Sequence, residues 1–425
     1  GYVETLKELD VAGVEPLAAW AVPPAAGVAF LQLTSGSTAF PKAVRISHRA
    51  ILANCRGIGL TGGGVVEEDV VVCWLPLNHD MGLVGLFLFA LYWDRDLVLL
   101  RPETFLARPI RWLEAFSAFG GTITSAPDFA YRYAIEKTTP EERAGLDLSR
   151  WRVACTGAET VWESTLDRFG ETFAPHGFRR EAFIPCYGMA ETTLAATFQL
   201  AGRGPRVSDF GPEVFPESKE GRTRRIVSVG RPLLEHRIEV RSPSGEALPD
   251  RVEGEIAVRG PCVFDGYHGE PERTAETLVD GWVRTGDLGV TDGGELYVTG
   301  RMKEILKVDG KAFAVQELEW VATEAIGASD VRACVFGVLE AGRECPVLVA
   351  EVPAEDEALL ARWSADIHRN IARDFGTPLA DLAFVRRGDI PRTTSGKMRR
   401  NELKSLYLEG KLDRVGPAAG RKADP

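Results

Sequence analysis

The chain has 425 residues, of which 45% are hydrophobic and 26% are charged, and its net charge at pH 7 is −11. These totals are typical of a soluble globular protein with more than one core, and the acidic balance argues against a general nucleic-acid binder. The longest apolar stretch, Met81 to Trp93, is too short to span a bilayer, and the seven cysteines include no Cys-x-x-Cys pair. We therefore expect a cytoplasmic protein without a membrane span, a disulfide framework or a zinc site.

The first predicted element is a buried strand at Val28–Leu33, which passes into a Thr/Ser/Gly cluster and then into Lys42. Small hydroxylated residues around Gly36 allow close backbone approach and offer N–H and O–H donors, so this loop suits a phosphate. It lacks the Gly-Lys-Ser/Thr ending of the P-loop, which argues against a P-loop kinase. On composition alone, a polar surface loop fits equally well.

Short apolar runs then alternate with amphipathic stretches as far as Phe198. They predict strands at 70–77, 97–100, 121–124, 151–156 and 182–186, and helices at 81–93, 110–119, 129–137 and 163–176. This alternation predicts an α/β fold with a doubly wound, mostly parallel sheet. In such a sheet, ligands bind in loops at the carboxyl ends of strands, here 34–42, 78–81, 157–159 and 187–191.

From Ile226 onward the pattern changes. Alternating strands at 237–241, 255–258 and 295–298, separated by Gly-containing turns, predict a small antiparallel, β-barrel-like unit. Strands at 304–308, 331–338 and 346–351 with a helix at 316–325 predict a small α+β unit. We therefore expect a large N-terminal domain over residues 1–301 and a small C-terminal domain over residues 302–425.

Eight motifs stand in series along the chain: TSGSTAFPK, LPLNHDMGL, TGAET, CYGMAETT, GEIAVRGPCVFDGYHG, WVRTGDLG, GRMKEILKVDGK and PRTTSGKMRR. Each is a weak signal alone, but their order resembles the adenylate-forming superfamily of acyl-CoA synthetases, luciferases and peptide-synthetase adenylation domains. LQLTSGST, HDMGLVG and PCYGMAETT look most like the fatty acyl-AMP ligases. The resemblance implies ATP-dependent activation of a fatty or related carboxylic acid to acyl-AMP. Pyrophosphate is released, and the acyl group passes to the phosphopantetheine thiol of an acyl carrier protein.

The resemblance also implies a nucleotide site on several loops. Its expected ATP- and AMP-binding residues are Thr34, Ser35, Gly36, Ser37, Thr38 and Lys42 at the phosphates, Gly157, Ala158, Glu159, Cys186, Tyr187, Gly188, Met189 and Ala190 around the adenine, and Asp287 and Arg301 at the ribose. Tyr187 would be the stacking face for the base. Glu191 would bind Mg²⁺, a hard cation that prefers oxygen ligands.

Two residues would carry the chemistry. Lys397, in TTSGK, would stabilise the negative charge that builds on the phosphoryl oxygens when a carboxylate attacks the α-phosphorus. His79 would lie where the carboxylate and the α-phosphate meet. Met81, Gly82 and Thr156 would line the acyl pocket.

Lys397 can reach the first loop only if the small domain is mobile and closes over the large one. Lys303 stands at the hinge position of the family. We therefore expect one domain orientation for adenylation and a rotated one for thioester formation.

Some features depart from the family pattern. Ala39 and Ala43 replace glycines, which makes the phosphate loop stiffer. The insertion between Gly188 and Gly230 is shorter than in typical acyl-AMP ligases, so an acyl-CoA synthetase remains the alternative, and a non-catalytic acyl- or nucleotide-binding homologue is disfavoured. Few residues precede the phosphate loop, which indicates that a front portion is missing. Oligomeric state and acyl length are not predicted.

An acidic carrier protein would dock on a basic patch of this acidic chain. The candidates are Arg222, Arg224, Arg225, Arg399 and Arg400.

Overall fold

The computed structural model describes residues 22–34, 42–215, 223–308, 311–327, 331–340, 343–353, 355–392 and 398–416. The first elements are β1 (Val28–Thr34) and β2 (Lys42–Ser47), which form an antiparallel pair. Helix α1 (His48–Thr61) follows directly, and its N-terminus is capped by the Ser47 hydroxyl, which accepts a hydrogen bond from the Ala50 N–H.

The prediction that β1 is a buried strand of the parallel sheet is wrong. Leu31 is 42% and Leu33 63% exposed, and β1 pairs with β2 outside the main sheet. The apolar run misled the interpretation because a strand buried on both faces and an apolar strand of a small outer ribbon have the same local composition.

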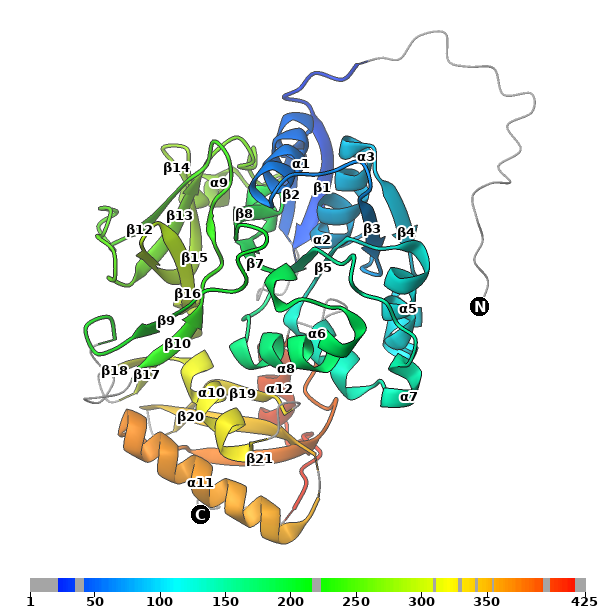
Figure 1. Ribbon diagram of the computed structural model, residues 1–425. Coiled ribbons are helices and arrows are strands. Elements are labelled where there is room, and N and C mark those ends of the chain that lie inside the picture. The colour runs from blue at the N-terminus through cyan, green and yellow to red at the C-terminus, as the bar shows by residue number, and fades with distance from the viewer. Residues whose placement is uncertain are drawn as a thin grey trace.

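A seven-stranded sheet forms the centre of the large N-terminal part, with the strand order β11-β8-β7-β6-β5-β3-β4 (Figure 1). Its strands are β3 (Val70–Cys73), β4 (Asp96–Leu99), β5 (Ile123–Ala126), β6 (Val153–Thr156), β7 (Phe183–Gly188), β8 (Ala195–Phe198) and β11 (Arg231–Pro232). Strands β3 to β7 are parallel, whereas β8 and β11 are antiparallel to their neighbours. The predicted mostly parallel sheet is therefore confirmed.

Helices pack against this sheet and enclose an aromatic core. They are α2 (Asp80–Gly82), the π-helix η2 (Leu83–Leu88), α3 (Phe89–Trp93), α4 (Pro102–Ala107), α5 (Ile110–Phe119), α6 (Asp128–Glu136), α7 (Pro140–Arg143) and α8 (Glu163–Phe173), with the 3₁₀ turns η3 (Ala174–His176), η4 (Arg180–Ala182) and η5 (Ala190–Thr192). Phe116 stacks on Trp151 and Phe105 on Trp74, each with ring centroids 3.8 Å apart. Such aromatic pairs add to the hydrophobic stabilisation of the core.

The predicted helix at 81–93 is instead three consecutive helical segments, α2, η2 and α3. Two glycines let this stretch approach its neighbours closely. A Cβ on Gly82 would lie 2.4 Å from the Pro76 carbonyl oxygen, and one on Gly85 would lie 2.7 Å from a Leu194 methyl carbon. Helical periodicity carries no information on such a π-helical segment, so the sequence did not predict it.

A five-stranded antiparallel sheet and a separate strand pair follow. The elements are β9 (Val207–Phe210) paired with β10 (Arg224–Val227), and the sheet strands β12 (Arg237–Arg241), β13 (Gly254–Arg259), β14 (Leu278–Val279), β15 (Trp282–Asp292) and β16 (Glu295–Arg301), with α9 (Pro271–Thr277). The predicted antiparallel unit is thus present. The long strand β15 was not predicted, because its Arg-Thr-Gly-Asp segment lacks an alternating pattern.

The C-terminal part has its own layers (Figure 1, yellow to red). It contains η6 (Met302–Glu304), the pair β17 (Ile305–Val308) and β18 (Lys311–Ala314), the sheet β19 (Ala333–Glu340), β20 (Arg343–Val352) and β21 (Asp381–Arg386), and helices α10 (Val315–Ile326), α11 (Glu357–Phe375) and α12 (Arg400–Leu408). Its buried apolar residues form clusters that contain no residue before Leu306. Among the described residues, no helix combines the length and the apolar composition that a bilayer crossing requires.

Candidate active site

A cavity of about 2320 Å³ lies at the carboxyl ends of the parallel strands and is also lined by the five-stranded sheet and the C-terminal part. The end of β1, the start of β2 and the segments after β3, β6 and β7 all contribute residues to its wall. This is the position at which a doubly wound sheet binds ligands. Most of the predicted site residues that the structure describes therefore meet in one cavity.

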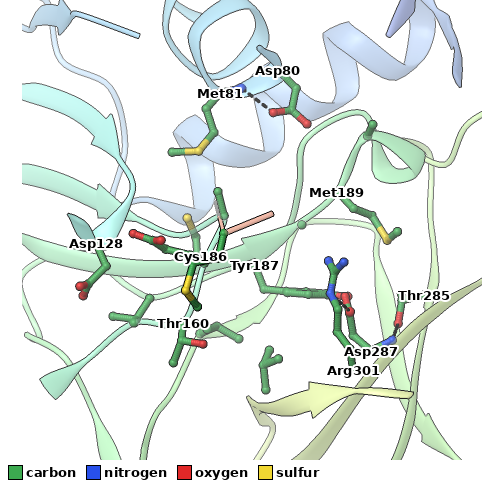
Figure 2. A pocket seen from close by; sticks show the side chains of 18 of the residues that line it. Asp80, Met81, Asp128, Thr160, Cys186, Tyr187, Met189, Thr285, Asp287 and Arg301 are labelled. Carbon is green, nitrogen blue, oxygen red and sulfur yellow. Dashed lines mark hydrogen bonds and ion pairs between the residues drawn. The ribbon is translucent and has the colours of Figure 1, made fainter. Parts of the chain in front are cut away.

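Tyr187, Asp287 and Arg301 form a hydrogen-bonded group on one wall (Figure 2). The Tyr187 hydroxyl donates to Asp287 Oδ2 at 2.7 Å, and Arg301 Nε lies 3.0 Å from Asp287 Oδ1. Asp287 and Arg301 are cross-strand partners on β15 and β16, so the hairpin register places them together. Burial and the Asp287 carboxylate raise the pKa of Tyr187, so its hydroxyl stays protonated and donates.

The turn after β6 carries the predicted adenine-binding residues. A Cβ on Gly157 would lie 2.7 Å from the Cys186 carbonyl oxygen, so glycine allows the ends of β6 and β7 to approach. Ala158 has φ +66°, a left-handed conformation that strains a non-glycine residue, and such strain is often found at ligand sites. Glu159 accepts a hydrogen bond from the Phe129 N–H at 2.6 Å.

The residues after β7 follow the cavity wall. Cys186, Gly188, Met189 and Ala190 line the cavity together with Tyr187, whereas Gly157 is not among the lining residues. A Cβ on Gly188 would lie only 1.8 Å from the Leu194 carbonyl oxygen, so no other residue fits there without a backbone shift. The glycine thus keeps this turn tight against the following strand.

Thr34 and Lys42 mark the two ends of the predicted phosphate loop. They are cross-strand partners on β1 and β2, and both line the cavity. Ser35, Gly36, Ser37 and Thr38, as well as Ala39, lie outside the described residues, and so does the predicted catalytic Lys397.

Glu191 lies in η5, lines the cavity and is 5% exposed. Its Oε1 accepts a hydrogen bond from the Tyr267 hydroxyl at 2.7 Å. Within the described part of the chain, no group of three or more His, Cys, Asp or Glu side chains could hold a metal. A single cavity-lining carboxylate nevertheless fits Mg²⁺, because this ion is commonly held by one or two carboxylates plus substrate phosphates.

Tyr267 is a residue to which the sequence analysis gave no role, although it stands in the motif GPCVFDGYHG. Its hydroxyl lies 3.4 Å from Lys42 Nζ, and Lys42 Nζ lies 4.8 Å from the centre of its ring. Burial and then the Glu191 carboxylate raise the pKa of Tyr267, which keeps the phenol protonated. Glu191 and Tyr267 are 76 positions apart, so only the fold brings them together.

His79 is the N-cap residue of α2. Its Nδ1 accepts a hydrogen bond from the Met81 N–H at 3.3 Å and lies 2.9 Å from Asp80 Oδ1. The ring therefore has a structural role at the helix start as well as a place on the cavity wall.

Of the three predicted acyl-pocket residues, Met81 lines the cavity, whereas Gly82 and Thr156 are buried and are not among its lining residues. The apolar residues that line the same region come from α1, η2, α3 and β8. They are Ile58, Leu83, Leu86, Phe89 and Phe198.

The prediction of an exposed basic docking patch is wrong for Arg224 and Arg400, and it stays a prediction for Arg225 and Arg399. Arg224 forms an ion pair with Glu317 and lies over the ring of Phe215, and its side chain is only 17% exposed. Arg400 is similarly enclosed in the C-terminal part, with a side chain that is 16% exposed.

Of the remaining candidates, Arg225 makes a two-pronged contact with Glu163, and Arg399 pairs with Glu402. Arg222 lies outside the described residues.

Comparison with known proteins shows the family to which the chain belongs. The model of the AMP-binding enzymes matches residues 4–268, more than half of the chain. The medium-chain-fatty-acid–[acyl-carrier-protein] ligase JamA of Moorena producens is 33% identical, over 91% of this chain and 69% of JamA. The long-chain-fatty-acid–AMP ligase FadD26 of Mycobacterium bovis is 34% identical, over 92% of this chain and 72% of FadD26.

Solved structures agree with this assignment. One from a study of fatty acyl-adenylate ligases of E. coli and L. pneumophila has a TM-score of 0.81 at 35% identity, over 90% of this chain and 70% of the other. An L. pneumophila fatty acyl-adenylate ligase in complex with acyl adenylate and pyrophosphate has a TM-score of 0.65 at 30% identity, over 92% of this chain and 71% of the other. The chain belongs to the AMP-binding enzymes of the adenylate-forming superfamily, as its ordered motifs predicted.

Proposed function

We propose that this enzyme is a fatty acyl-AMP ligase. It joins a fatty or related carboxylic acid to the AMP moiety of ATP, releases pyrophosphate, and transfers the acyl group to the phosphopantetheine thiol of an acyl carrier protein. The observation that carries this proposal is the group of Tyr187, Asp287 and Arg301 on the cavity wall. The relatives JamA and FadD26, whose names specify a carrier-protein ligase and an AMP ligase, support it.

We assign the ribose of the nucleotide to the group formed by Tyr187, Asp287 and Arg301. A carboxylate can accept hydrogen bonds from two vicinal hydroxyls, and Asp287 is held in place from both sides by the Tyr187 hydroxyl and Arg301. The Tyr187 ring then offers an apolar face to the adenine. This arrangement fixes the nucleoside before the reaction, so the α-phosphate is presented in a defined position.

In the first half-reaction, a carboxylate oxygen of the acid attacks the α-phosphorus and the bond to the bridging oxygen of pyrophosphate breaks. Thr34 and Lys42 line the phosphate end, and Glu191 would hold Mg²⁺. That ion would neutralise charge on the phosphate oxygens. Lys397 is proposed to donate to the phosphoryl oxygens as negative charge builds there. His79 lines the same cavity as Thr34 and Lys42.

In the second half-reaction, the thiol of the acceptor attacks the acyl carbonyl, and AMP leaves with the electron pair of the mixed-anhydride bond. A carrier protein is proposed as the acceptor. The test is to offer the preformed acyl-adenylate complex either a phosphopantetheinylated carrier protein or free CoA. We expect acyl transfer to the carrier at least tenfold faster, and faster transfer to CoA would make the enzyme an acyl-CoA synthetase.

Adenylation itself is tested by pyrophosphate exchange. Labelled pyrophosphate should enter ATP only when a fatty acid is present, because only reversal of acyl-AMP formation resynthesises ATP. A panel of acids of increasing length would identify the preferred substrate. Nucleotide binding without any acid-dependent exchange would instead make the chain a non-catalytic homologue.

We further propose that residues 302–425 move as a small C-terminal domain about a hinge at Lys303. The boundary is supported by the separate apolar clusters on its two sides and by the short η6 turn in which Lys303 lies. Replacing Lys303 with proline should spare one half-reaction and impair the other, because it restricts the backbone at the pivot. Equal loss in both half-reactions would contradict the hinge.

A further inference from the structure

We infer that Tyr267 is a positioning residue for the metal–nucleotide complex: its hydroxyl orients the Glu191 carboxylate. The inference rests on the proposed function, because it assumes that Glu191 meets the metal of a metal–ATP substrate. Tyr267 comes from the loop between β13 and α9, far in sequence from both partners. No role was predicted for its side chain from the sequence.

The geometry of the hydroxyl supports this role. Tyr267 Oη donates to Glu191 Oε1 at 2.7 Å and lies 3.4 Å from Lys42 Nζ. The Lys42 ammonium can only donate, so Tyr267 Oη accepts from it, and the single phenolic proton points to the Glu191 carboxylate. Within the described part of the chain, this is the one side-chain hydrogen bond that Glu191 makes, which leaves Oε2 for a further ligand.

The position of Tyr267 is fixed independently of Glu191. Its backbone pairs with Val44 of β2, and its N–H donates to the Thr274 hydroxyl at 2.9 Å. Its ring packs edge-on against Phe264 with centroids 4.9 Å apart, and the residue is 4% exposed. The hydroxyl is therefore held by a rigid frame and can act as a fixed donor, as groups that orient metal ligands do.

The same hydroxyl also meets the Lys42 side chain. Lys42 Nζ lies 3.4 Å from Tyr267 Oη and 4.8 Å from the ring centre, so the ammonium lies beside the hydroxyl end of the ring. A phenol oxygen can accept one hydrogen bond while it donates its proton to another group. The Tyr267 hydroxyl therefore accepts from Lys42 and donates to Glu191, and it links a cation and a carboxylate that both line the cavity.

The test variant is Tyr267→Phe, which removes the hydroxyl and keeps the ring and its packing. Binding of ATP is measured by calorimetry on the whole chain, once with Mg²⁺ and once with EDTA. We expect the variant to bind ATP about tenfold more weakly with Mg²⁺ and equally well, within twofold, with EDTA. The matched control is Tyr297→Phe, which removes another buried hydroxyl, hydrogen-bonded to Ser208 at 2.9 Å. The control should match the unaltered enzyme in both conditions.

A double-mutant cycle sharpens the assignment. If Tyr267 acts through Glu191, then adding Tyr267→Phe to Glu191→Gln should cause no more than a twofold further loss of Mg²⁺-dependent affinity. Equal weakening with Mg²⁺ and with EDTA would mean that the hydroxyl only maintains local structure, and would overturn the inference.

Unchanged binding in both conditions, or additive losses in the cycle, would overturn it too. The inference would also be overturned if the unaltered chain bound ATP no more tightly with Mg²⁺ than with EDTA. The proposed function fails separately, if Mg²⁺-dependent ATP binding is seen without acid-dependent pyrophosphate exchange.

Discussion

Two ion pairs of this enzyme each join an arginine to a carboxylate, but they differ in how far solvent reaches the arginine side chain. Arg301 meets Asp287 on the cavity wall, with an arginine side chain that is 57% exposed. Arg400 meets Glu319 inside the C-terminal part, and it also donates to the Val335 carbonyl oxygen at 2.6 Å.

The Arg400–Glu319 pair makes further contacts with the surrounding protein. Arg400 Nη2 lies 3.3 Å from Glu304 Oε2, and the Val335 N–H donates to Glu319 at 2.8 Å. Both pairs line the same cavity, but the Arg400 side chain is only 16% exposed and is held by these protein groups, whereas the Arg301 side chain is open to solvent. The difference teaches that a charged pair is a candidate binding site when solvent reaches it, and a structural link when the protein satisfies it.

The largest effect is expected at the enclosed pair. Replacing Arg400 with alanine leaves the Glu319 carboxylate buried without its cation, and burial already raises the pKa of Glu319. We expect a loss of about 3–5 kcal/mol in the unfolding free energy, measured by denaturant titration.

The control is the neighbouring Arg399→Ala, which removes an exposed pair with Glu402 and should change stability by less than about 1 kcal/mol. Equal effects of the two substitutions would show that Arg400 is not the structural link described above.

At the open pair, the expected effect is on the substrate rather than on the fold. Replacing Asp287 with asparagine removes the charge and one acceptor, so kcat/KM for ATP should fall about 100-fold. Asp292→Asn is the control, since Asp292 is the last residue of β15 and pairs with Arg251 at 2.9 Å. If the two variants have the same kcat/KM for ATP, the ribose site does not lie at Asp287.

The smallest effect concerns a buried carboxyl in another part of the cavity lining (Figure 2). Burial raises the pKa of Asp128 from 3.8 to about 7, with Arg132 opposing the rise and Glu159 adding to it. The folded protein therefore holds this proton longer than the unfolded chain does. The stabilisation is complete below the ordinary pKa and is lost as the pH rises to about 7.

We expect the unfolding free energy to decrease by roughly 1–3 kcal/mol over that range because of Asp128. Asp128→Asn, which does not titrate, should flatten the pH dependence. An identical pH dependence of the two proteins would contradict the assignment.

Much of the large part was predictable because its strands are buried on both faces and read as short apolar runs. The resemblance carried by the RTGDLG and GRMK motifs predicts that Asp287 and Arg301 share one site, and the β15–β16 register explains why the two residues meet. Local sequence could not place Tyr267, because its role depends on Glu191, 76 positions away.

Charge runs misled the interpretation for a similar reason. Arg399 and Arg400 are adjacent in the sequence and looked equally exposed. The start of α12 turns the first outward, whereas the second reaches Glu319, which is 81 positions away. The burial of a long charged side chain depends on such a distant partner, and composition does not reveal it.

The most direct test of the central claim is detection of the acyl-adenylate itself. The enzyme is incubated with α-labelled ATP, Mg²⁺ and a fatty acid, without any thiol acceptor, and the products are separated. We predict labelled acyl-AMP in an amount that depends on the acid, and about 100-fold slower formation by Asp287→Asn at limiting ATP. Absence of labelled acyl-AMP across a panel of acids from short to long chains would contradict the account.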